Sequence, residues 1–296
     1  ARRRFRVWLA LDRILGPLHE DEILWFLALW LASAAGFLVA WPLNWGLPGL
    51  RTHLLFFPLW LGYVLVMDAL VLRRRGTSLF TRSRRRFVLL FVVSAPAWWL
   101  FEVFNWRTQN WHYLGREQFG DLAYFALASV AFSTVMPAVF ETAEWVRSFG
   151  WVERLRPGPR VPDTRRTHAV LLGAGLLLVA LIMAWPDVFY PFIWAAVFCL
   201  LTPLGARLDH RTLVEDLDRR DWRPVVALAL GALVCGFFWE MWNVYAYPKW
   251  VYRTPGVQFW HVFEMPLLGY IGYPPFALEL FALLHLVSGR RRVLNL

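Results

Sequence analysis

The sequence has very little cysteine and no histidine grouping that would hold a metal ion. The two cysteines, Cys199 and Cys235, both lie inside apolar segments, where cysteine usually acts as a small packing residue. None of the seven histidines belongs to a Glu-x-x-His or His-x3-His set, the spacings typical of di-iron centres and of paired histidine ligands. The sequence therefore predicts neither a metal site nor a disulfide framework.

The motifs that bind nucleotides or carry a hydrolase nucleophile are also missing. There is no P-loop, no dinucleotide-binding fingerprint and no Gly-x-Ser-x-Gly turn, so no cofactor is expected. The net charge of +10 could suggest a nucleic-acid partner. The basic residues, however, form short clusters between apolar runs, which is typical of the loops of membrane proteins. We therefore expect no nucleic-acid binding.

Long apolar runs make up most of the chain. Hydrophobic residues account for 58% of the 296 positions, with 19 Trp and 24 Phe, which is more than an ordinary soluble domain carries. A bilayer span needs about 20 apolar residues, and eight segments are long enough. They lie near 22–44, 53–72, 87–106, 121–146, 168–186, 188–206, 224–245 and 261–288. The predicted fold class is an all-α integral membrane protein with eight transmembrane helices.

The positions of lysine and arginine predict the orientation. Of the 31 basic residues, 26 fall in the N-terminal arm, in every second connection between spans and in the C-terminal tail; five fall in the other connections. Because basic residues concentrate on the cytoplasmic side, both termini are expected in the cytoplasm. The expected location is the inner (plasma) membrane of the cell, which the chain crosses several times.

The chain divides into two similar halves. Residues 22–146 and 168–288 are predicted to be two four-helix repeats, joined by a cytoplasmic linker at 147–167 that contains Pro157-Gly158-Pro159 among arginines. Segment 1–21 is predicted to be a basic interfacial segment, and 289–296 a basic cytoplasmic tail. Each half has an even number of spans, so the repeats should be parallel and related by an axis along the membrane normal.

A residue set that occurs twice is the strongest functional signal. A Glu and an Asn stand three positions apart, followed by a Trp-x-Tyr, and then by a helix in which a Glu follows a Pro at four positions. The first copy consists of Glu102, Asn105, Trp111, Tyr113, Pro137 and Glu141, and the second of Glu240, Asn243, Trp250, Tyr252, Pro275 and Glu279.

Depth separates the four repeated glutamates into two pairs. At 1.5 Å of rise per residue, Glu102 lies roughly 24 Å above Arg86, and Glu240 lies at a similar height. Glu141 and Glu279 lie lower, nearer the cytoplasmic side. Ionisable groups inside a bilayer usually face the protein interior and mark function. A carboxyl in apolar surroundings also holds its proton tightly, which suits a general acid.

Each of these residue types also has a purely structural explanation. The aromatic residues could form a belt at the membrane interface, or instead line a pocket that stabilises positive charge through their ring faces. The two outer glutamates, Glu102 and Glu240, could be buried carboxyls satisfied by an asparagine or an indole N–H. Pro137 and Pro275 could bend their helices or could expose carbonyl groups near a site.

At these residues the chain resembles the membrane-bound lycopene cyclase type of carotenoid cyclase. The match is clearest at Asn243, Trp250, Tyr252, Gly272-Tyr273, Pro275 and Glu279, and the earlier copy offers Asn105, Trp111, Tyr113, Gly115, Pro137 and Glu141. The Pro-x-Glu-Glu of that family is replaced in both copies by Pro-x-x-x-Glu, and each half has four spans instead of the usual three. The resemblance implies cofactor-free cyclisation of a polyene end group, in which an acidic residue protonates a terminal double bond and aromatic rings stabilise the cation.

Three functions remain open from the sequence. The first is a polyene- or isoprenoid-binding membrane protein that acts as an end-group cyclase, with Glu240, Glu102, Glu279 and Glu141 as acid–base candidates and the asparagines, prolines and Trp-x-Tyr residues of both copies around the ligand. The second is a non-catalytic pigment- or lipid-binding subunit of a larger membrane complex. The third is a proton-coupled transporter, since duplicated halves and carboxyls inside the membrane also suit proton coupling.

Overall fold

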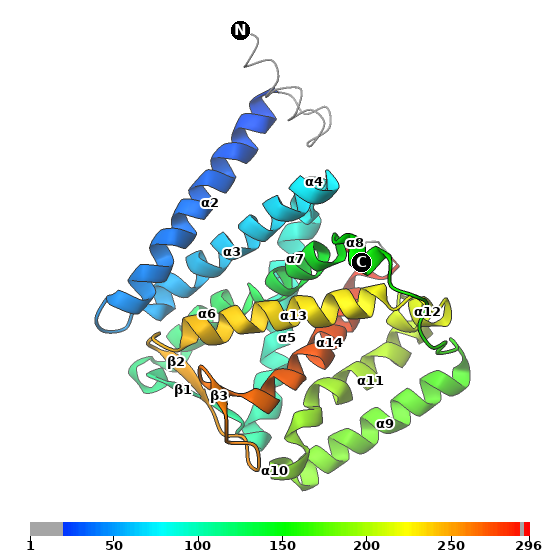
Figure 1. The fold of residues 1–296 in the computed structure, drawn as a ribbon. Coiled ribbons are helices and arrows are strands. Elements are labelled where there is room, and N and C mark those ends of the chain that lie inside the picture. Colours follow the sequence, from blue (N-terminus) through cyan, green and yellow to red (C-terminus); the bar gives the residue numbers. More distant parts are fainter. Residues whose placement is uncertain (1–19, 291–292) are drawn as a thin grey trace.

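The fold is all-helical apart from two short ribbons, and eight of its described helices are long and apolar enough to cross a membrane. The computed structural model describes residues 20–290 and 293–296, with side chains from residue 27 onward (Figure 1). Within the described part, the chain is therefore a multi-pass membrane protein. The predicted interfacial segment 1–21 falls outside the described residues except for its last two positions, and so do 291–292 of the predicted tail.

The first four spans consist of five helices, and a short sixth helix connects two of the spans. α2 (Glu20–Gly46) and α3 (Thr52–Arg75) lie side by side, and the short α4 (Leu79–Arg82) leads into α5 (Arg84–Thr108) (Figure 1). The fourth span is divided into α6 (Asp121–Phe132) and α7 (Val135–Arg147). α3 ends in three arginines and a left-handed Gly76, whose N–H donates to Leu72, as is usual at helix C-termini.

The second four spans follow a partly irregular linker. After α8 (Gly150–Glu153), residues 154–164 have no regular structure, and α9 (Arg165–Ala184) begins at a Thr164 cap. The sixth span is α10 (Pro186–Phe189), the 3₁₀ turn η2 (Tyr190–Phe192) and α11 (Ile193–Arg207). The short α12 (Leu213–Asp218) precedes α13 (Arg223–Asn243), and the last span is η3 (Leu267–Gly272) with α14 (Tyr273–Ser288). It starts later than the expected residue 261, because β3 (His261–Val262) and β4 (Met265–Pro266) form a hairpin.

Ser94 forms hydrogen bonds to the backbone on both sides of the break between α6 and α7. Pro137 has no backbone N–H, so the helix cannot continue its hydrogen-bond ladder here. The Ser94 hydroxyl of α5 donates to the Phe132 carbonyl at 2.6 Å and accepts the Met136 N–H at 3.0 Å. One buried hydroxyl thus satisfies two backbone groups that would otherwise be unpaired in an apolar environment.

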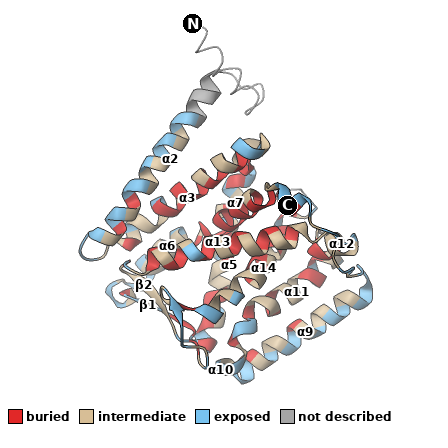
Figure 2. Cartoon of the chain, in the orientation of Figure 1, coloured by how far each residue is buried: buried red, intermediate tan, exposed pale blue. Residues whose placement is uncertain are grey.

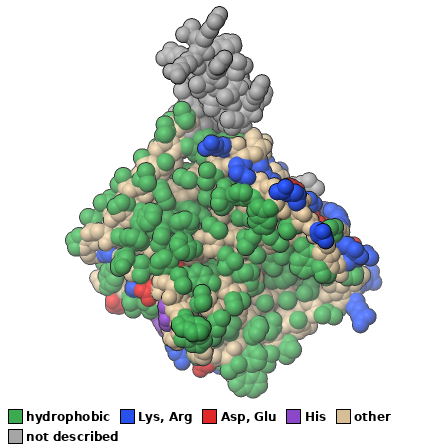
Figure 3. All heavy atoms as spheres, viewed as in Figure 1, with side chains coloured by type: hydrophobic (Ala, Val, Ile, Leu, Met, Phe, Trp, Pro, Cys, Tyr) green, Lys and Arg blue, Asp and Glu red, His purple; other side chains and the backbone are tan. Residues whose placement is uncertain are grey.

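α7 is the most buried helix and lies between α3, α5 and α13 (Figure 2). Its approach to α13 depends on Gly231, where a Cβ would lie 2.7 Å from the Ala143 backbone. α9, by contrast, has only Gly175 and Ile182 buried and packs mainly on α11 (Figure 2). Apolar side chains cover the middle of the molecule, and many basic side chains gather along the edge formed by the ends of the helices (Figure 3). This division suits a protein with lipid around its middle.

A two-stranded ribbon joins the two halves at the opposite end of the bundle. β1 (Trp111–Leu114) follows α5 and pairs antiparallel with β2 (Lys249–Tyr252), which follows α13 (Figure 1). In this register Trp111 is opposite Tyr252, and Tyr113 is opposite Trp250. The two Trp-x-Tyr segments of the duplicated set therefore lie against each other.

Candidate functional site

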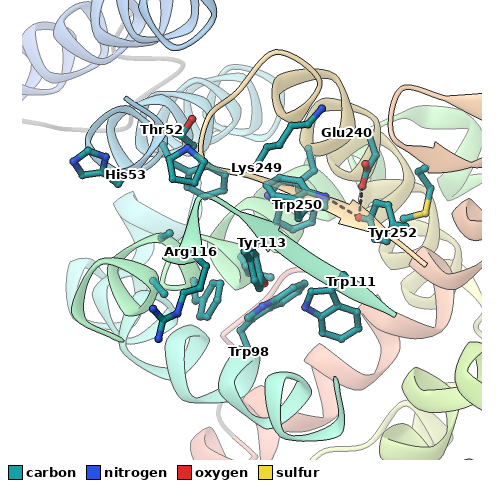
Figure 4. Close-up of a pocket in the computed structure, with 18 of the residues that line it drawn as sticks. Thr52, His53, Trp98, Trp111, Tyr113, Arg116, Glu240, Lys249, Trp250 and Tyr252 are labelled. Atoms are coloured by element: carbon teal, nitrogen blue, oxygen red, sulfur yellow. Dashed lines mark hydrogen bonds between the residues drawn. The ribbon is translucent and has the colours of Figure 1, made fainter. Parts of the chain in front are cut away.

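A cavity of about 220 Å³ lies behind the β1–β2 ribbon, between the two halves (Figure 4). Its walls are mainly aromatic and aliphatic, with one carboxyl, Glu240, and two cations, Arg116 and Lys249. Trp111, Tyr113, Trp250 and Tyr252 of the duplicated set all line it. Four of the predicted ligand-contacting residues are therefore brought together at one cavity.

The two asparagines hold the ribbon in place. Asn243 donates from its amide to the Trp250 carbonyl at 2.7 Å and accepts the Trp250 N–H at 3.0 Å. Asn105 likewise donates to the Trp111 carbonyl at 2.8 Å and accepts the N–H groups of Asn110 and Trp111. Each amide thus uses both its donor and its acceptor on the backbone of a ribbon strand. Neither asparagine lines the cavity.

Glu240 is fully buried, and one of its carboxyl oxygens is held by tyrosines. The hydroxyls of Tyr252 and Tyr273 donate to Oε1 at 2.6 and 2.9 Å. The Trp250 indole donates to the Tyr252 hydroxyl at 2.9 Å, which extends the network along the ribbon (Figure 4). Oε2 is buried and has no hydrogen-bond partner among the described residues. The carboxyl therefore has one fixed oxygen and one unpaired oxygen.

Glu102 has a different set of donors. Its Oε1 accepts from the indoles of Trp98 and Trp111 at 3.0 Å each, and from the Tyr113 hydroxyl at 2.6 Å. Three donors on one oxygen fix this carboxyl firmly. It does not line the cavity itself, but all three of its donors do. The two repeated glutamates are therefore connected to the same cavity through the two Trp-x-Tyr segments.

The ribbon tyrosines remain hydroxyl donors over a wide pH range. Burial, and then the neighbouring Glu240 carboxyl, raise the pKa of Tyr252 well above its usual value. Burial and Glu102 raise the pKa of Tyr113 in the same way. Both hydroxyls therefore keep their protons at physiological pH, which maintains the hydrogen bonds to the carboxyls.

Tryptophan and phenylalanine rings form much of the remaining wall. The rings of Trp111 and Trp194 are stacked, 6.3 Å apart and inclined by 14°. Phe276 contacts Trp98 and Trp194 with ring edges, at 5.9 and 5.0 Å between centroids. Aromatic faces attract positive charge, and the attraction grows where water is excluded. Such a wall can hold an apolar chain and can stabilise a cation formed on it.

The lower glutamates and the prolines of the duplicated set lie away from this cavity. Pro137 and Pro275 stand in the first turns of α7 and α14, and neither lines the cavity. Glu141 and Glu279 are fully buried deeper in the bundle, and their oxygens have no hydrogen-bond partner among the described residues. The structure thus brings together the outer glutamates with the aromatic residues, and leaves the inner pair apart.

Other buried carboxyls have structural partners. Asp68 accepts the Ser78 hydroxyl at 2.8 Å and the Phe80 N–H at 3.0 Å, which fixes the turn before α4. Glu144 pairs with Arg82 at 2.5 Å and accepts the Asn295 N–H. Within the described residues, no group of three His, Cys, Asp or Glu side chains could hold a metal ion.

Several residues of the site were not among the predicted ones. Trp98 stands one helical turn before Glu102, so the four-residue spacing could have identified it. Tyr273 belongs to the family resemblance but was not expected beside Glu240, which it follows by 33 positions; only the fold brings the two together. The remaining unforeseen aromatic residues of the wall include Trp194, Trp239 and Phe276. They come from α11, α13 and α14 and carry no local signal.

Comparison with protein-family models, with curated proteins and with solved structures finds no match for the chain.

Proposed function

We propose that the chain binds an isoprenoid polyene in the ribbon cavity and cyclises its end group, with Glu240 as the general acid. The observation that carries this proposal is that Glu240 lines an aromatic cavity with a carboxyl whose Oε1 is fixed by two hydroxyls and whose buried Oε2 is unpaired among the described residues. The resemblance to carotenoid cyclases is independent of this geometry and favours the same chemistry.

The reaction would be an isomerisation that needs no cofactor. Glu240 gives its proton to one carbon of a terminal C=C bond, and the other carbon becomes cationic. The electron pair of a second C=C bond then forms the ring C–C bond, which moves the positive charge along the chain. A C–H bond next to this cation breaks, and its proton returns to Glu240. The product has the same composition as the substrate.

The site residues would act on successive stages of this reaction. The hydroxyls of Tyr252 and Tyr273 stabilise the Glu240 carboxylate after it has given up its proton, because charge-assisted hydrogen bonds are about twice as strong as neutral ones. The aromatic rings stabilise the cation. Exclusion of water by the apolar walls keeps the cation from being captured as an alcohol.

The finer arrangement of the chain belongs to the same proposal. We take the two halves to be parallel repeats, with both termini and the arginine-rich edge in the cytoplasm of a cell whose inner membrane holds the protein. The matching roles of Asn105 and Asn243 support the repeats. The gathering of basic side chains at one edge supports the orientation (Figure 3).

Lipid extraction from cells that accumulate lycopene tests the proposal. Such cells also contain linear prenyl precursors, so one extraction covers both kinds of substrate. We expect wild type to produce an isomer of equal mass with one additional ring, and Glu240→Gln to lose it by at least 100-fold, the scale of general acid catalysis. Glu279→Gln, a buried carboxyl away from the cavity, is the matched control and should retain the product. No cyclised isoprenoid in wild type would refute the proposal.

A non-catalytic pigment- or lipid-binding subunit is the second candidate. The same aromatic cavity would hold a polyene without changing it, and the firmly bound Glu102 suits a structural role for the carboxyls. Mass spectrometry of molecules that co-purify with the native protein separates the two. A polyene recovered unchanged, together with partner proteins, would favour the subunit. Proton-coupled transport stays a third hypothesis; proteoliposome flux that is insensitive to Glu240 and Glu279 substitution would remove it.

A further inference from the structure

The cavity is small and is partly open to the outside of the protein. Its volume is about 220 Å³, whereas pockets that enclose a drug-sized ligand have about 300–1,000 Å³. A polyene such as lycopene is larger than a drug-sized ligand. The cavity therefore has room for one end of such a chain, and the rest of the chain has to lie outside it.

The two cations of the wall are already bonded within the protein. Lys249 pairs with Glu264 and donates to the Val244 carbonyl at 3.3 Å. Arg116 pairs with Asp121. The other wall residues are mainly aromatic and aliphatic. We therefore expect the end of the ligand that enters the cavity to be apolar.

Hydrogen bonds tie together the segments around the start of α3. The Tyr247 carbonyl accepts the N–H groups of Arg51 and Thr52 at 3.0 Å each, and the Tyr247 hydroxyl accepts from the Gln118 amide at 2.8 Å. The loop after β1 lies close to this tyrosine, because a Cβ added to Gly115 would be 3.2 Å from its ring. Several polar contacts thus hold this side of the cavity.

α6 is a single layer between the cavity and the outside of the bundle. One face of the helix lines the cavity with Leu127, Ala128 and Ala131. On the other face, Leu122 and Val130 are 82% and 48% exposed. Because α6 belongs to a membrane-spanning segment, its exposed apolar face is expected to contact lipid.

α6 is held by α5 more firmly than by α3. Trp99 of α5 stacks on Phe125 at 5.0 Å between ring centroids and donates from its indole to Ser129 at 2.9 Å. α6 also contacts α3, but in the part of the chain that the structure describes no hydrogen bond joins these two helices. After the break, α7 is bonded to α3 by the hydroxyls of Tyr63 and Thr142 at 2.8 Å. The seam between α3 and α6 is thus a side of the cavity that polar contacts do not hold.

We infer that the ligand enters the cavity end-on from the bilayer, through the seam between α3 and α6, and leaves the rest of its chain in the lipid. This inference rests on the proposed function and defines its substrate class as membrane-dissolved chains with a free apolar end. Thr52 and His53 at the start of α3 lie on the side of the cavity away from Glu240 (Figure 4). An end that enters beside α3 therefore passes the aromatic wall before it reaches Glu240. The protein recognises the end of the chain, and neither its length nor its far end.

Two ligands that differ only at the far end test the inference. Geranylgeranyl methyl ether and geranylgeranyl trityl ether are titrated into the full chain in phospholipid nanodiscs, with tryptophan fluorescence as the signal, since five tryptophans line the cavity. We expect the two affinities to agree within about twofold, because the bulky trityl group stays in the lipid. The same chain with a trityl group at both ends should not bind, which shows that the signal comes from an inserted end.

A photoreactive group at the far end locates the rest of the chain. Benzophenone replaces the trityl group, and mass spectrometry identifies what is labelled after irradiation. We expect label on the phospholipid and on outward-facing residues of α3 and α6, such as Leu54, Leu122 and Val130. Label on residues 115–119 or 247–249 would place the chain at the ribbon end of the cavity and would overturn the inference.

Two alanines of α6 form a matched pair for the seam. Ala131 lines the cavity, whereas Ala126 is exposed and does not line it. We expect Ala131→Phe to slow association of the methyl ether at least tenfold, and Ala126→Phe to leave it unchanged. Equal association rates in the two variants contradict entry through the seam. If Ala131→Phe does not fold, the comparison of the two ethers in wild type still decides.

The outcomes separate the inference from the proposed function. If wild type binds the methyl ether but binds the trityl ether at least tenfold more weakly, the whole chain is enclosed and the inference fails, while an isoprenoid-binding function stands. If neither ether binds and no cyclised product forms in cells, the proposed function fails together with the inference.

Discussion

The ring of Tyr273 occupies the space that a side chain at Gly236 would fill: a Cβ added to Gly236 would lie 2.4 Å from the ring. Gly236 precedes Glu240 by four positions, and Trp98 precedes Glu102 by the same four. In the first half the indole of Trp98 donates to the glutamate, whereas in the second half the hydroxyl of Tyr273 does so. This exchange of an indole for a hydroxyl is one of two differences between the carboxyl sites. The other is that the Trp111 indole donates to Glu102, whereas the Trp250 indole donates to the Tyr252 hydroxyl.

Substitution of Gly236 by alanine should displace Tyr273 from Glu240. Overpacking of a tight contact costs about 1–3 kcal/mol, so we expect a lower thermal midpoint and weaker cyclisation. Gly173→Ala on α9, where no atom lies within 4 Å of the added Cβ, is the matched control. Tyr273→Phe keeps the ring and removes only the hydroxyl, so it should lower activity with little change in midpoint. An unchanged midpoint and activity in Gly236→Ala would contradict the packing argument.

Asn243→Asp should loosen the ribbon. A carboxylate can still accept the Trp250 N–H but cannot donate to the Trp250 carbonyl, which then faces a negative charge. Leaving such a group unpaired costs about 1–3 kcal/mol. We expect faster hydrogen exchange in residues 249–252 and a matching increase in 111–114. His112→Ala, exposed on the same ribbon, should leave the exchange unchanged. Exchange as slow in Asn243→Asp as in wild type would show that the two hydrogen bonds between Asn243 and Trp250 are not needed to hold the ribbon.

Acid should remove a stabilising contribution at the arginine-rich edge. The hydrogen bond from Arg147, and then the nearby charges of Arg147, Arg223 and Arg75, lower the pKa of Glu153. A carboxyl whose pKa is lower in the folded protein than in the unfolded chain stabilises the fold fully at pH values above its ordinary pKa of about 4.3. This stabilisation is lost as the pH falls through the folded-state pKa. Half of the Glu153 side chain is exposed, so screening limits the contribution to at most about 1 kcal/mol.

Thermal midpoints of wild type and Glu153→Gln between pH 3 and 8 measure this contribution. The difference between them should be constant above pH 6 and should shrink below about pH 4.3. High salt should reduce it at every pH. Glu117→Gln, on an exposed turn without an ion pair among the described residues, should track wild type throughout. If the difference in thermal midpoint grew toward low pH, the pKa of Glu153 would be raised by folding instead of lowered, and the stabilising role given to Glu153 would be wrong.

The eight spans could be predicted from the sequence because apolar length and basic clusters are local properties. The duplication indicated equal depth for the two Glu-x-x-Asn sets but left open whether the two copies share a site. The pairing of β1 with β2 brings the two Trp-x-Tyr segments together. The last span was expected six residues too early, because residues 261–266 lead directly into the apolar run but form a hairpin.

The roles of individual side chains could not be predicted in the same way. Asn105 and Asn243 were expected to contact a ligand, yet their amides are used by the backbone. A sequence does not tell whether an amide meets a peptide group or a substrate, because both offer the same hydrogen bonds. The wall of the cavity joins residues near positions 52, 116 and 249, and only the tertiary fold brings these to one cavity.

The register of the ribbon has a consequence for symmetry. Trp111 faces Tyr252 and Tyr113 faces Trp250, so the Trp-x-Tyr of each half meets the other in reverse, about a centre at the His112–Val251 pair. Between two subunits, a contact of this kind is called isologous, because the same surface patch of each subunit binds the other. Two separate copies of one four-helix unit could form the same ribbon around a two-fold axis. In a single chain, unlike a symmetric pair of identical units, the two carboxyl sites can differ, with Trp98 beside one and Tyr273 beside the other.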